Sequence, residues 1–248
     1  MSCGQRFAPF IIAAAGAAGI TLVAPGDARA ANGAFVVDDS DTPPGGSCKL
    51  ESWVSFASNS NFIASTVPTC AFDFGGRVIE FSAQFQRFRV DGEWGTGLVT
   101  KAKTNFIPSG TGKLGVGLAG GTAHDLITGE TVGAYAYVPF TYGVTDDFKI
   151  LVNGGWLFDR PTDQHFLTYG AAIEWNFVKP LTLIAEVFGL AGQRTDPRTI
   201  TDPRFQAGLR YTPMDAFDID LIYGRNITGE NANWVTVGLN VRFPAPGK

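Results

Sequence analysis

The chain has 248 residues and a formal net charge of −4, and its charged fraction of 17% lies below the roughly 25% usual for soluble domains. Its 31 glycines and its aromatic fraction of 12% are both high. The sequence has no basic tract or basic excess, so we expect no nucleic-acid partner, and the composition is typical of a β-rich membrane or secreted protein.

The first thirty residues have the pattern of an export signal. Arg6 supplies a short positive region, an apolar run covers residues 7–24, and "ARA" at 28–30 forms an A-x-A cleavage site. We therefore predict that residues 1–30 are a cleaved signal peptide. The alternative is an uncleaved membrane anchor, for which the many Ala and Gly residues make the apolar run weak.

Residues 31–47 follow the signal and are acidic, with a Pro-Pro-Gly-Gly run and no sustained period, so we expect a linker. Cys48 and Cys70 are the cysteines that remain in the exported chain. An even pair in an exported chain predicts a disulfide formed in an oxidising compartment, and two free thiols are the alternative. No third thiol or nearby histidine suggests a metal site, and we expect no cofactor.

From Cys48 onward strand-like segments follow one another, and no helix is expected in the mature chain. In "DIDLIYGRNITGENANWVTVGLNVRF", residues 218–243, apolar residues alternate with polar ones, as they do when side chains of a strand point to two faces in turn. Lengths of roughly ten to fourteen residues match tilted strands that cross a hydrocarbon layer. The predicted strands are 48–57, 66–74, 77–90, 93–106, 113–125, 130–143, 147–158, 164–178, 181–192, 203–212, 216–225 and 233–243.

The connections between these strands alternate in length. Short turns such as "GG" at 75–76 and "VTDD" at 144–147 alternate with longer connections, of which Gln193–Pro203 is the longest. Outer-membrane barrels have this asymmetry, with tight periplasmic turns and longer outer loops. We therefore predict an all-β fold, a transmembrane antiparallel up-and-down β-barrel of about twelve strands over residues 48–248. Ten strands would result if Cys48 to Phe74 formed a plug or an unusual hairpin.

The size of the barrel decides which face meets lipid. A barrel of about twelve strands would enclose a wide apolar void if its apolar face pointed inward, so that face is expected outside and the polar face inside. If the mixed lumen charges pair, they partly close the pore; if they segregate, they line an eyelet; a purely stabilising network is the third reading. The expected lumen charges are Glu80, Lys101, Lys103, Glu174, Glu186, Arg210, Asp218, Asp220 and Arg242.

The last predicted strand resembles the signal read by the barrel-assembly machinery, which makes that machinery an expected partner. Alternate apolar residues lead to a final aromatic residue, although "PAPGK" follows it here. The residues that carry this pattern are Val235, Val237, Leu239, Val241 and Phe243.

Two longer segments carry a wider resemblance. "EWNFVKPLTLIAEVFG" and "PRFQAGLRYTPMDAFDIDLIYGRNITGENANWVTVGLNVRF" resemble exported barrel proteins of rhizobial and related alphaproteobacteria, similar to the outer-membrane family associated with meta-pathway phenol degradation. The resemblance covers most of the mature chain and is strongest after residue 170. It implies a transporter-like channel and brings no catalytic residues.

We therefore predict an outer-membrane channel for small solutes, with aromatic or hydrophobic solutes among them. Outward Arg87 and Arg89 would meet lipopolysaccharide phosphates near the outer rim. One alternative is a structural or surface-interaction barrel without transport, and another is a soluble periplasmic β-sandwich that binds a ligand. The least favoured is a rim hydrolase, whose candidate residues are His124, His165, Asp125, Asp159 and Asp163. The loop Gln193–Pro203 is the candidate for gating or surface contact.

Overall fold

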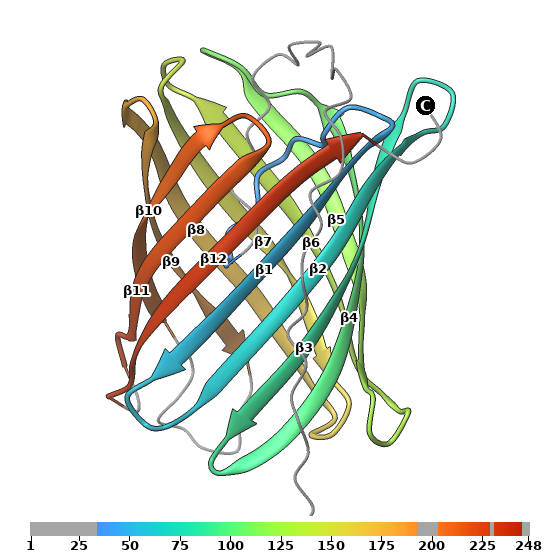
Figure 1. The fold of residues 1–248 in the computed structure, drawn as a ribbon. Helices are drawn as coiled ribbons and strands as arrows, with labels where there is room; N and C mark the ends of the chain where they lie inside the picture. The colour runs from blue at the N-terminus through green and yellow to red at the C-terminus, as the bar shows by residue number, and fades with distance from the viewer. Residues whose placement is uncertain (1–33, 193–202, 229–230, 245–248) are drawn as a thin grey trace, which may run out of the picture.

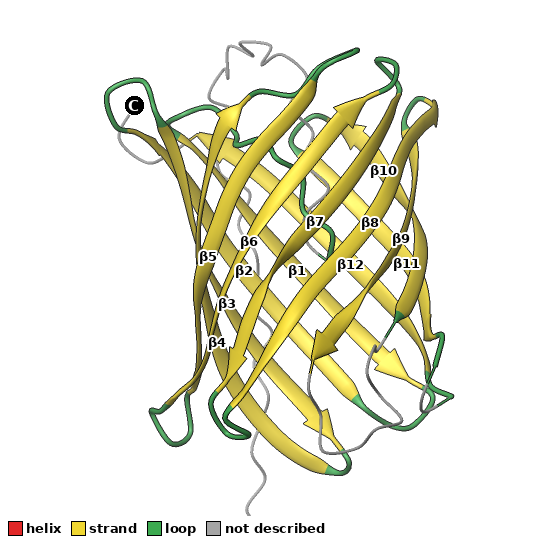
Figure 2. Cartoon of the chain, turned by 180° about the vertical axis from the view of Figure 1, so that it is seen from behind, coloured by secondary structure: helices red, strands yellow, loops and turns green. Residues whose placement is uncertain are grey.

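A computed structural model of the chain describes residues 34–192, 203–228 and 231–244. Within these ranges twelve antiparallel strands pair in chain order, and β12 pairs with β1 to close a barrel (Figures 1 and 2). The described residues include no helix long and apolar enough to cross a membrane. The strands are β1 (Ser47–Ala57), β2 (Phe62–Asp73), β3 (Val78–Val90), β4 (Glu93–Ile107), β5 (Leu114–Asp125), β6 (Thr131–Gly143), β7 (Phe148–Asp159), β8 (Gln164–Val178), β9 (Leu181–Gly192), β10 (Arg204–Met214), β11 (Phe217–Asn226) and β12 (Asn233–Pro244).

These strands agree with the sequence prediction in number and closely in position. The alternative of ten strands is wrong, because β1 and β2 each pair with a neighbour on both sides. The largest difference is at β2, which begins at Phe62 rather than at residue 66. A turn closed by the Ala57 N–H donating to the Asn61 carbonyl, 2.9 Å, already places Phe62 opposite Phe56.

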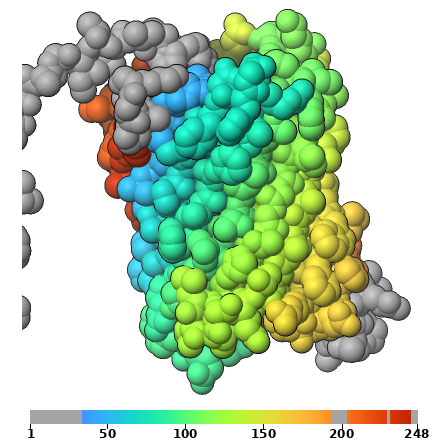
Figure 3. Space-filling model, turned by 90° about the vertical axis from the view of Figure 1, so that its right-hand side faces the viewer, coloured from blue at the N-terminus to red at the C-terminus, as the bar shows by residue number. Residues whose placement is uncertain are grey.

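Apolar and charged side chains divide between the two faces of the barrel wall. On the outward face Leu221 is 58% exposed and Val237 47%, whereas inward-facing Glu80 and Lys103 are each 1% exposed. Figure 3 shows this outer surface as a continuous wall over the middle strands. A band of exposed apolar residues around a polar interior is the arrangement of a transmembrane barrel and confirms the predicted orientation of the faces.

The barrel has a terminal end, where β1 begins and β12 ends, and a loop end opposite; the terminal end is at the top of Figure 1. The predicted alternation of short and long connections has two exceptions. At the loop end, Asp91 and Gly92 form a tight turn with φ of 51° and 88°, as in two-residue hairpins. At the terminal end, residues 108–113 make a longer connection. Residues 193–202 of the predicted gating loop lie outside the described residues.

Residues 34–46, which we name the lumenal strap, fall in the segment expected as a linker. They form no strand, yet they lie inside the barrel, where Val37 and Ser40 are fully buried. In Figure 1 the strap is the blue segment that runs from within the lumen to the start of β1. The next residues join the wall, and a disulfide links Cys48 to Cys70, its partner directly opposite on β2. The predicted disulfide is therefore present.

Candidate functional site in the barrel lumen

The deepest part of the strap is held by one carboxylate of the wall. Glu186 of β9 accepts hydrogen bonds from the Val36 N–H at 2.7 Å and the Val37 N–H at 2.9 Å. Its Oε1 also accepts from the Gln206 side chain at 2.6 Å, and Gln206 donates to the Ala34 carbonyl at 3.1 Å. These contacts satisfy backbone groups of the strap that have no strand partner.

Apolar side chains of the strap fill the space between these polar contacts. Phe35 packs with Ile184 and Ile222, and the guanidinium of Arg210 lies 5.6 Å from the centre of the Phe35 ring. Val37 packs in a second apolar cluster, formed by the following wall residues: Leu151, Ala172 and Phe188. The strap therefore contributes a small hydrophobic core inside a largely polar lumen.

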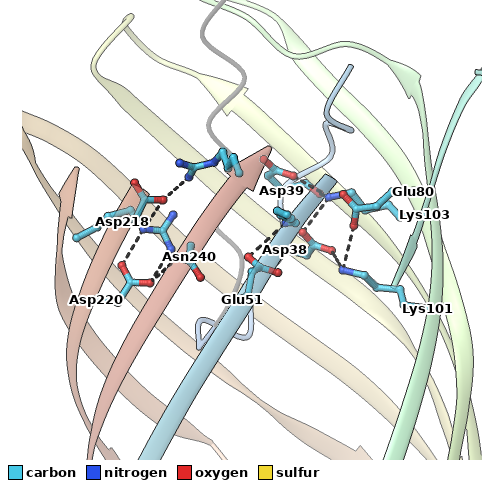
Figure 4. A network of polar contacts seen from close by, with 12 residues as sticks. Asp38, Asp39, Glu51, Glu80, Lys101, Lys103, Asp218, Asp220 and Asn240 are labelled. Carbon is cyan, nitrogen blue, oxygen red and sulfur yellow. Dashed lines mark hydrogen bonds and ion pairs between the residues drawn. The ribbon is translucent and has the colours of Figure 1, made fainter. Parts of the chain in front are cut away.

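The middle of the strap places two carboxylates against two lysines of β4, in what we name the acid–lysine cluster (Figure 4). Lys103 Nζ lies 2.9 Å from Asp38 Oδ1 and 2.8 Å from Asp39 Oδ1, and Lys101 Nζ lies 3.1 Å from Asp38 Oδ2. The Tyr137 hydroxyl of β6 donates to Asp38 Oδ2 at 2.8 Å. Glu80 of β3 completes the cluster, 3.6 Å from Lys101.

The pKa values of the two buried strap carboxyls are shifted in opposite directions. Burial disfavours the charged form of Asp38, but the ammonium groups of Lys101 and Lys103 outweigh it and hold the pKa of that carboxyl well below its usual range. Asp39 shares Lys103 with Asp38, and burial raises the pKa of Asp39 to about 7. Near neutral pH, the strap therefore carries one firmly ionised carboxylate and one that titrates.

The upper part of the strap is anchored to the long terminal-end connection. The Asn105 amide donates to the Ser40 carbonyl at 2.7 Å, and the Ser109 N–H donates to Asp41 Oδ1 at 3.0 Å. The Ser40 N–H donates to the Thr141 hydroxyl at 2.8 Å. Residues 108–113 therefore supply part of the strap's binding surface.

A second group of charges lies on β10, β11 and β12, and we name it the arginine cluster. Arg210 binds Asp220 with two hydrogen bonds, Nε to Oδ1 at 2.8 Å and a terminal nitrogen to Oδ2 at 3.0 Å. Asn240 donates to the same carboxylate at 3.0 Å, and Arg242 contacts Asp218. Figure 4 shows this cluster across the lumen interior from the acid–lysine cluster. In both clusters the charges pair with the opposite sign, as one reading of the sequence expects.

Tyrosines of β6 reach the lysine strand because β5 between them has small residues. The rings of Tyr135 and Tyr137 stack with centroids 6.2 Å apart, and the Tyr135 hydroxyl donates to the Thr100 carbonyl at 2.8 Å. A Cβ at Gly121 would lie 2.9 Å from the Tyr135 hydroxyl and 1.7 Å from the Thr100 oxygen. The "GLAGG" segment at 117–121 therefore provides room for side chains that build the lumen.

The half of the lumen nearer the loop end has a different lining. The Trp234 indole donates to Gln206 at 3.0 Å, and the Phe88 ring lies over Gly95. The register of the strands places further rings on the same inward face toward that end. Aromatic residues of this loop-end half include Phe88, Tyr135, Phe166, Phe188 and Trp234. The lumen thus changes from aromatic at the loop end to charged at the terminal end.

The structure places all the predicted lumen charges on the inward face. Glu80, Lys101 and Lys103 meet in one cluster, and Arg210, Asp218, Asp220 and Arg242 meet in the other. Glu186 binds the strap, and Glu174 is buried on β8 opposite Lys149.

Reasoning from the sequence missed the strap residues Asp38, Asp39 and Asp41 and the wall residue Tyr137. The acidic run "DDSD", directly before a barrel whose lumen contains two lysines, could have identified the strap acids.

The two histidines and the predicted assembly signal lie on the outward face. His124 contacts the hydroxyls of Thr122 at 2.8 Å and Thr131 at 3.1 Å, and His165 stacks on Trp156 and Phe158. The two histidines are on β5 and β8, which two other strands separate. The apolar residues of the predicted assembly signal line the outward face of β12: Val235, Val237, Leu239, Val241 and Phe243.

Fold and lumen together define a transmembrane β-barrel whose polar interior contains its own N-terminal segment. The chain belongs to the family described as "Uncharacterised conserved protein UCP029691", whose model matches residues 19–243. No curated protein matches the sequence.

Solved structures with a similar fold include two porins and an outer-membrane channel. The NanC porin is 10% identical with a TM-score of 0.61 and covers 77% of this chain and 98% of its own. The COG4313 outer membrane channel from Pseudomonas putida F1 is 12% identical, with a TM-score of 0.59 and coverage of 83% and 98%. The KdgM porin is 13% identical, with a TM-score of 0.58 and coverage of 79% and 99%. At these levels of sequence identity, the similarity shows a shared fold and nothing further.

Proposed function

We propose that this protein is an outer-membrane channel for small solutes, narrowed in its terminal half by the lumenal strap. The main observation behind this proposal is the way in which the strap is held inside the lumen. A polar lumen inside an apolar wall contains a segment held by side chains such as Glu186, Lys103 and Asn105 rather than by strand pairing. A segment held in this way can leave the lumen without opening the barrel wall.

The export signal and the topology support a location in the outer membrane. Residues 1–30 would direct the chain out of the cytoplasm and be removed, and the even number of strands would place both termini of the mature chain in the periplasm. Residues 1–30 lie outside the described residues. The similar folds of two porins and an outer-membrane channel support the same location.

The solutes we propose are small and include aromatic or hydrophobic compounds. The aromatic lining of the loop-end half supports this, because rings such as Phe88 and Trp234 offer stacking surfaces to a solute that enters from outside. The resemblance to the family associated with meta-pathway phenol degradation points to the same class. No catalytic role is proposed.

The proposal includes two binding partners of the barrel, lipopolysaccharide and the barrel-assembly machinery. The outward side chains Arg87 and Arg89 lie 5.0 and 5.7 Å from the Trp94 ring at the loop end, where cations would meet the phosphates of lipopolysaccharide. The outward apolar stripe of β12 that ends in Phe243 is the surface we assign to recognition by the barrel-assembly machinery.

Conductance in planar bilayers tests the channel. The wild-type chain is compared with a variant that lacks residues 34–41, after both have shown the heat-dependent mobility in SDS gels that marks a folded barrel. We expect discrete conductance steps, larger in the variant because the terminal half of its lumen is empty of the strap. A barrel that stays sealed in both forms would favour the alternative of a structural or surface-interaction barrel, which the extensive charge pairing in the lumen also accommodates.

A further inference from the structure

The acid–lysine cluster has the organisation of a binding site with its ligand in place. The receiving groups, Lys101, Lys103 and Tyr137, project from β4 and β6, which are fixed by strand pairing on both sides. The occupying groups, Asp38 and Asp39, come from a segment without strand structure. The wall therefore keeps the site formed whether or not the strap is docked.

Each oxygen of the Asp38 carboxylate has its own donor. Oδ1 is 2.9 Å from Lys103 Nζ, while Oδ2 is 3.1 Å from Lys101 Nζ and 2.8 Å from the Tyr137 hydroxyl. Lys103 also reaches the second carboxylate, Asp39 Oδ1, at 2.8 Å. Two ammonium groups and a phenol that converge on a pair of carboxylates form a receptor for a small dianion.

The charge of the wall requires an anion at this place. Lys103 is buried and Lys101 is partly buried. The wall around them has three lysines, Lys49, Lys101 and Lys103, and two acids, Glu51 and Glu80, so one positive charge is left over. Removal of the strap would leave one positive charge in excess in a confined space, where an unpaired buried charge is costly. The excess favours replacement of the strap by another anion.

The position of the site also suits a solute. The cluster lies on the terminal side of the aromatic loop-end half, so a molecule that enters from the loop end passes the aromatic residues before it reaches the lysines. A solute at this point would meet the strap carboxylates already bound. Passage then requires the solute to take their place.

We propose that Lys101, Lys103 and Tyr137 form a binding site for small dicarboxylates, and that the strap occupies it as an internal mimic which such a solute displaces. This inference deepens the proposed channel function and rests on it for its biological meaning. The binding itself can be measured without transport. The strap carboxylates and the carboxylates of the solute would compete for the same three donors.

Binding of succinate to the detergent-solubilised full-length barrel tests the proposal. We expect Asp38→Asn to bind succinate about tenfold more tightly than the wild type or more, because an internal occupant present about nine-tenths of the time lowers apparent affinity tenfold. Asp91→Asn, which removes an acid from the exposed loop-end turn, serves as the matched control and should bind as the wild type does. Succinamide, which has the same shape without charge, should not bind to any form.

Two further variants keep the test decisive. Lys101→Met, added to Asp38→Asn, should abolish the gain in succinate affinity. If Asp38→Asn fails the heat-dependent mobility assay, the variant that lacks residues 34–41 should give a gain of the same sign, since it removes the strap from the site. Equal succinate affinity in wild type and strap variants, or equal binding of succinamide, would overturn the proposal.

Conductance separates failure of this site from failure of the channel. A barrel that conducts, but whose strap variants bind succinate no better than the wild type, overturns the dicarboxylate site and leaves the channel standing. A barrel that never conducts, but binds succinate tightly only when the strap acids are removed, supports the site and overturns the channel.

Discussion

At the scale of single residues, Gly121 determines how the lysine-bearing wall meets the tyrosines. A Cβ there would lie 1.7 Å from the Thr100 oxygen, so the β4–β5 pairing would have to shift. We expect Gly121→Ala to destabilise the barrel by about 1–3 kcal/mol or more, as overpacking does. The matched control is Gly154→Ala on the outward face of β7, where an added Cβ meets nothing within 4 Å.

Unfolding by denaturant in detergent micelles measures the two free energies. Gly154→Ala should leave stability unchanged or raise it by about 0.5–1 kcal/mol, the usual gain when glycine in a strand becomes alanine. Equal stability of the two variants would mean that the close approach at Gly121 is not a constraint on the fold.

Arg210 is the cation on which the second cluster depends. Its two hydrogen bonds to Asp220, at 2.8 and 3.0 Å, hold a carboxylate that is fully buried. Arg210→Met should cost about 3–5 kcal/mol of unfolding free energy, because it leaves buried carboxylates without their main counter-charge. Arg210→Met/Asp220→Asn should recover most of this loss. A double variant as unstable as the single one would show that packing around Arg210, rather than charge, carries its contribution.

At the scale of elements, the strap is attached by contacts that depend on protonation. Asp39 faces Lys103 from β4 and its strap neighbours Asp38 and Asp41, and burial raises its pKa to about 7. A docked strap therefore binds a proton that a free strap releases, so the contribution of Asp39 to docking is complete below the ordinary aspartate pKa and is lost as pH rises through about 7. Asp38 has a lowered pKa and acts in the opposite direction, since its contribution is lost in acid.

Strap docking should consequently be strongest in mildly acid solution. We expect conductance to increase between about pH 5 and about pH 8 as Asp39 ionises and the strap loosens. Single-channel recording across this range is the measurement, and Asp39→Asn is the control that should flatten the pH profile. A wild-type profile identical to that of Asp39→Asn would rule out this group as the source.

The first hairpin, formed by β1 and β2, is held by a covalent bond as well as by strand pairing. The Cys48–Cys70 disulfide lies where β1 and β2 are already paired, next to the point at which the strap enters the lumen. It therefore fixes the start of the wall beside the strap. An oxidising compartment is the environment in which such a bond persists.

At the scale of the whole molecule, the orientation of the wall is the property that membrane insertion depends on. Leu221 lies in the middle of β11 and is 58% exposed on the outward face. Leu221→Arg should cost about 2–4 kcal/mol in lipid, the range for an arginine at the midplane of a transmembrane barrel. Folding into vesicles measures the cost. A negligible effect there, with a stable protein free of detergent, would instead indicate a water-soluble barrel.

Most of the wall follows from local sequence pattern. A period of two along each strand specifies its two faces, and turn residues such as Asp91-Gly92 mark where the chain reverses, so strand number and the inward charges were predictable. The start of β2 was not, because Phe62 joins the strand through a hydrogen-bonded turn that the alternation does not reveal.

By itself, the sequence determined the strands, the apolar outer face and the pair of cysteines, because each depends on neighbours along the chain or on composition. Only the tertiary structure decided what occupies the lumen. Asp38 meets Lys101 and Lys103 across more than sixty residues of chain, at sequence separations of 63 and 65, and Glu186 meets Val36 at a separation of 150. No local period encodes such contacts, since they arise when the closed wall brings charges of opposite sign around a segment that forms no strand.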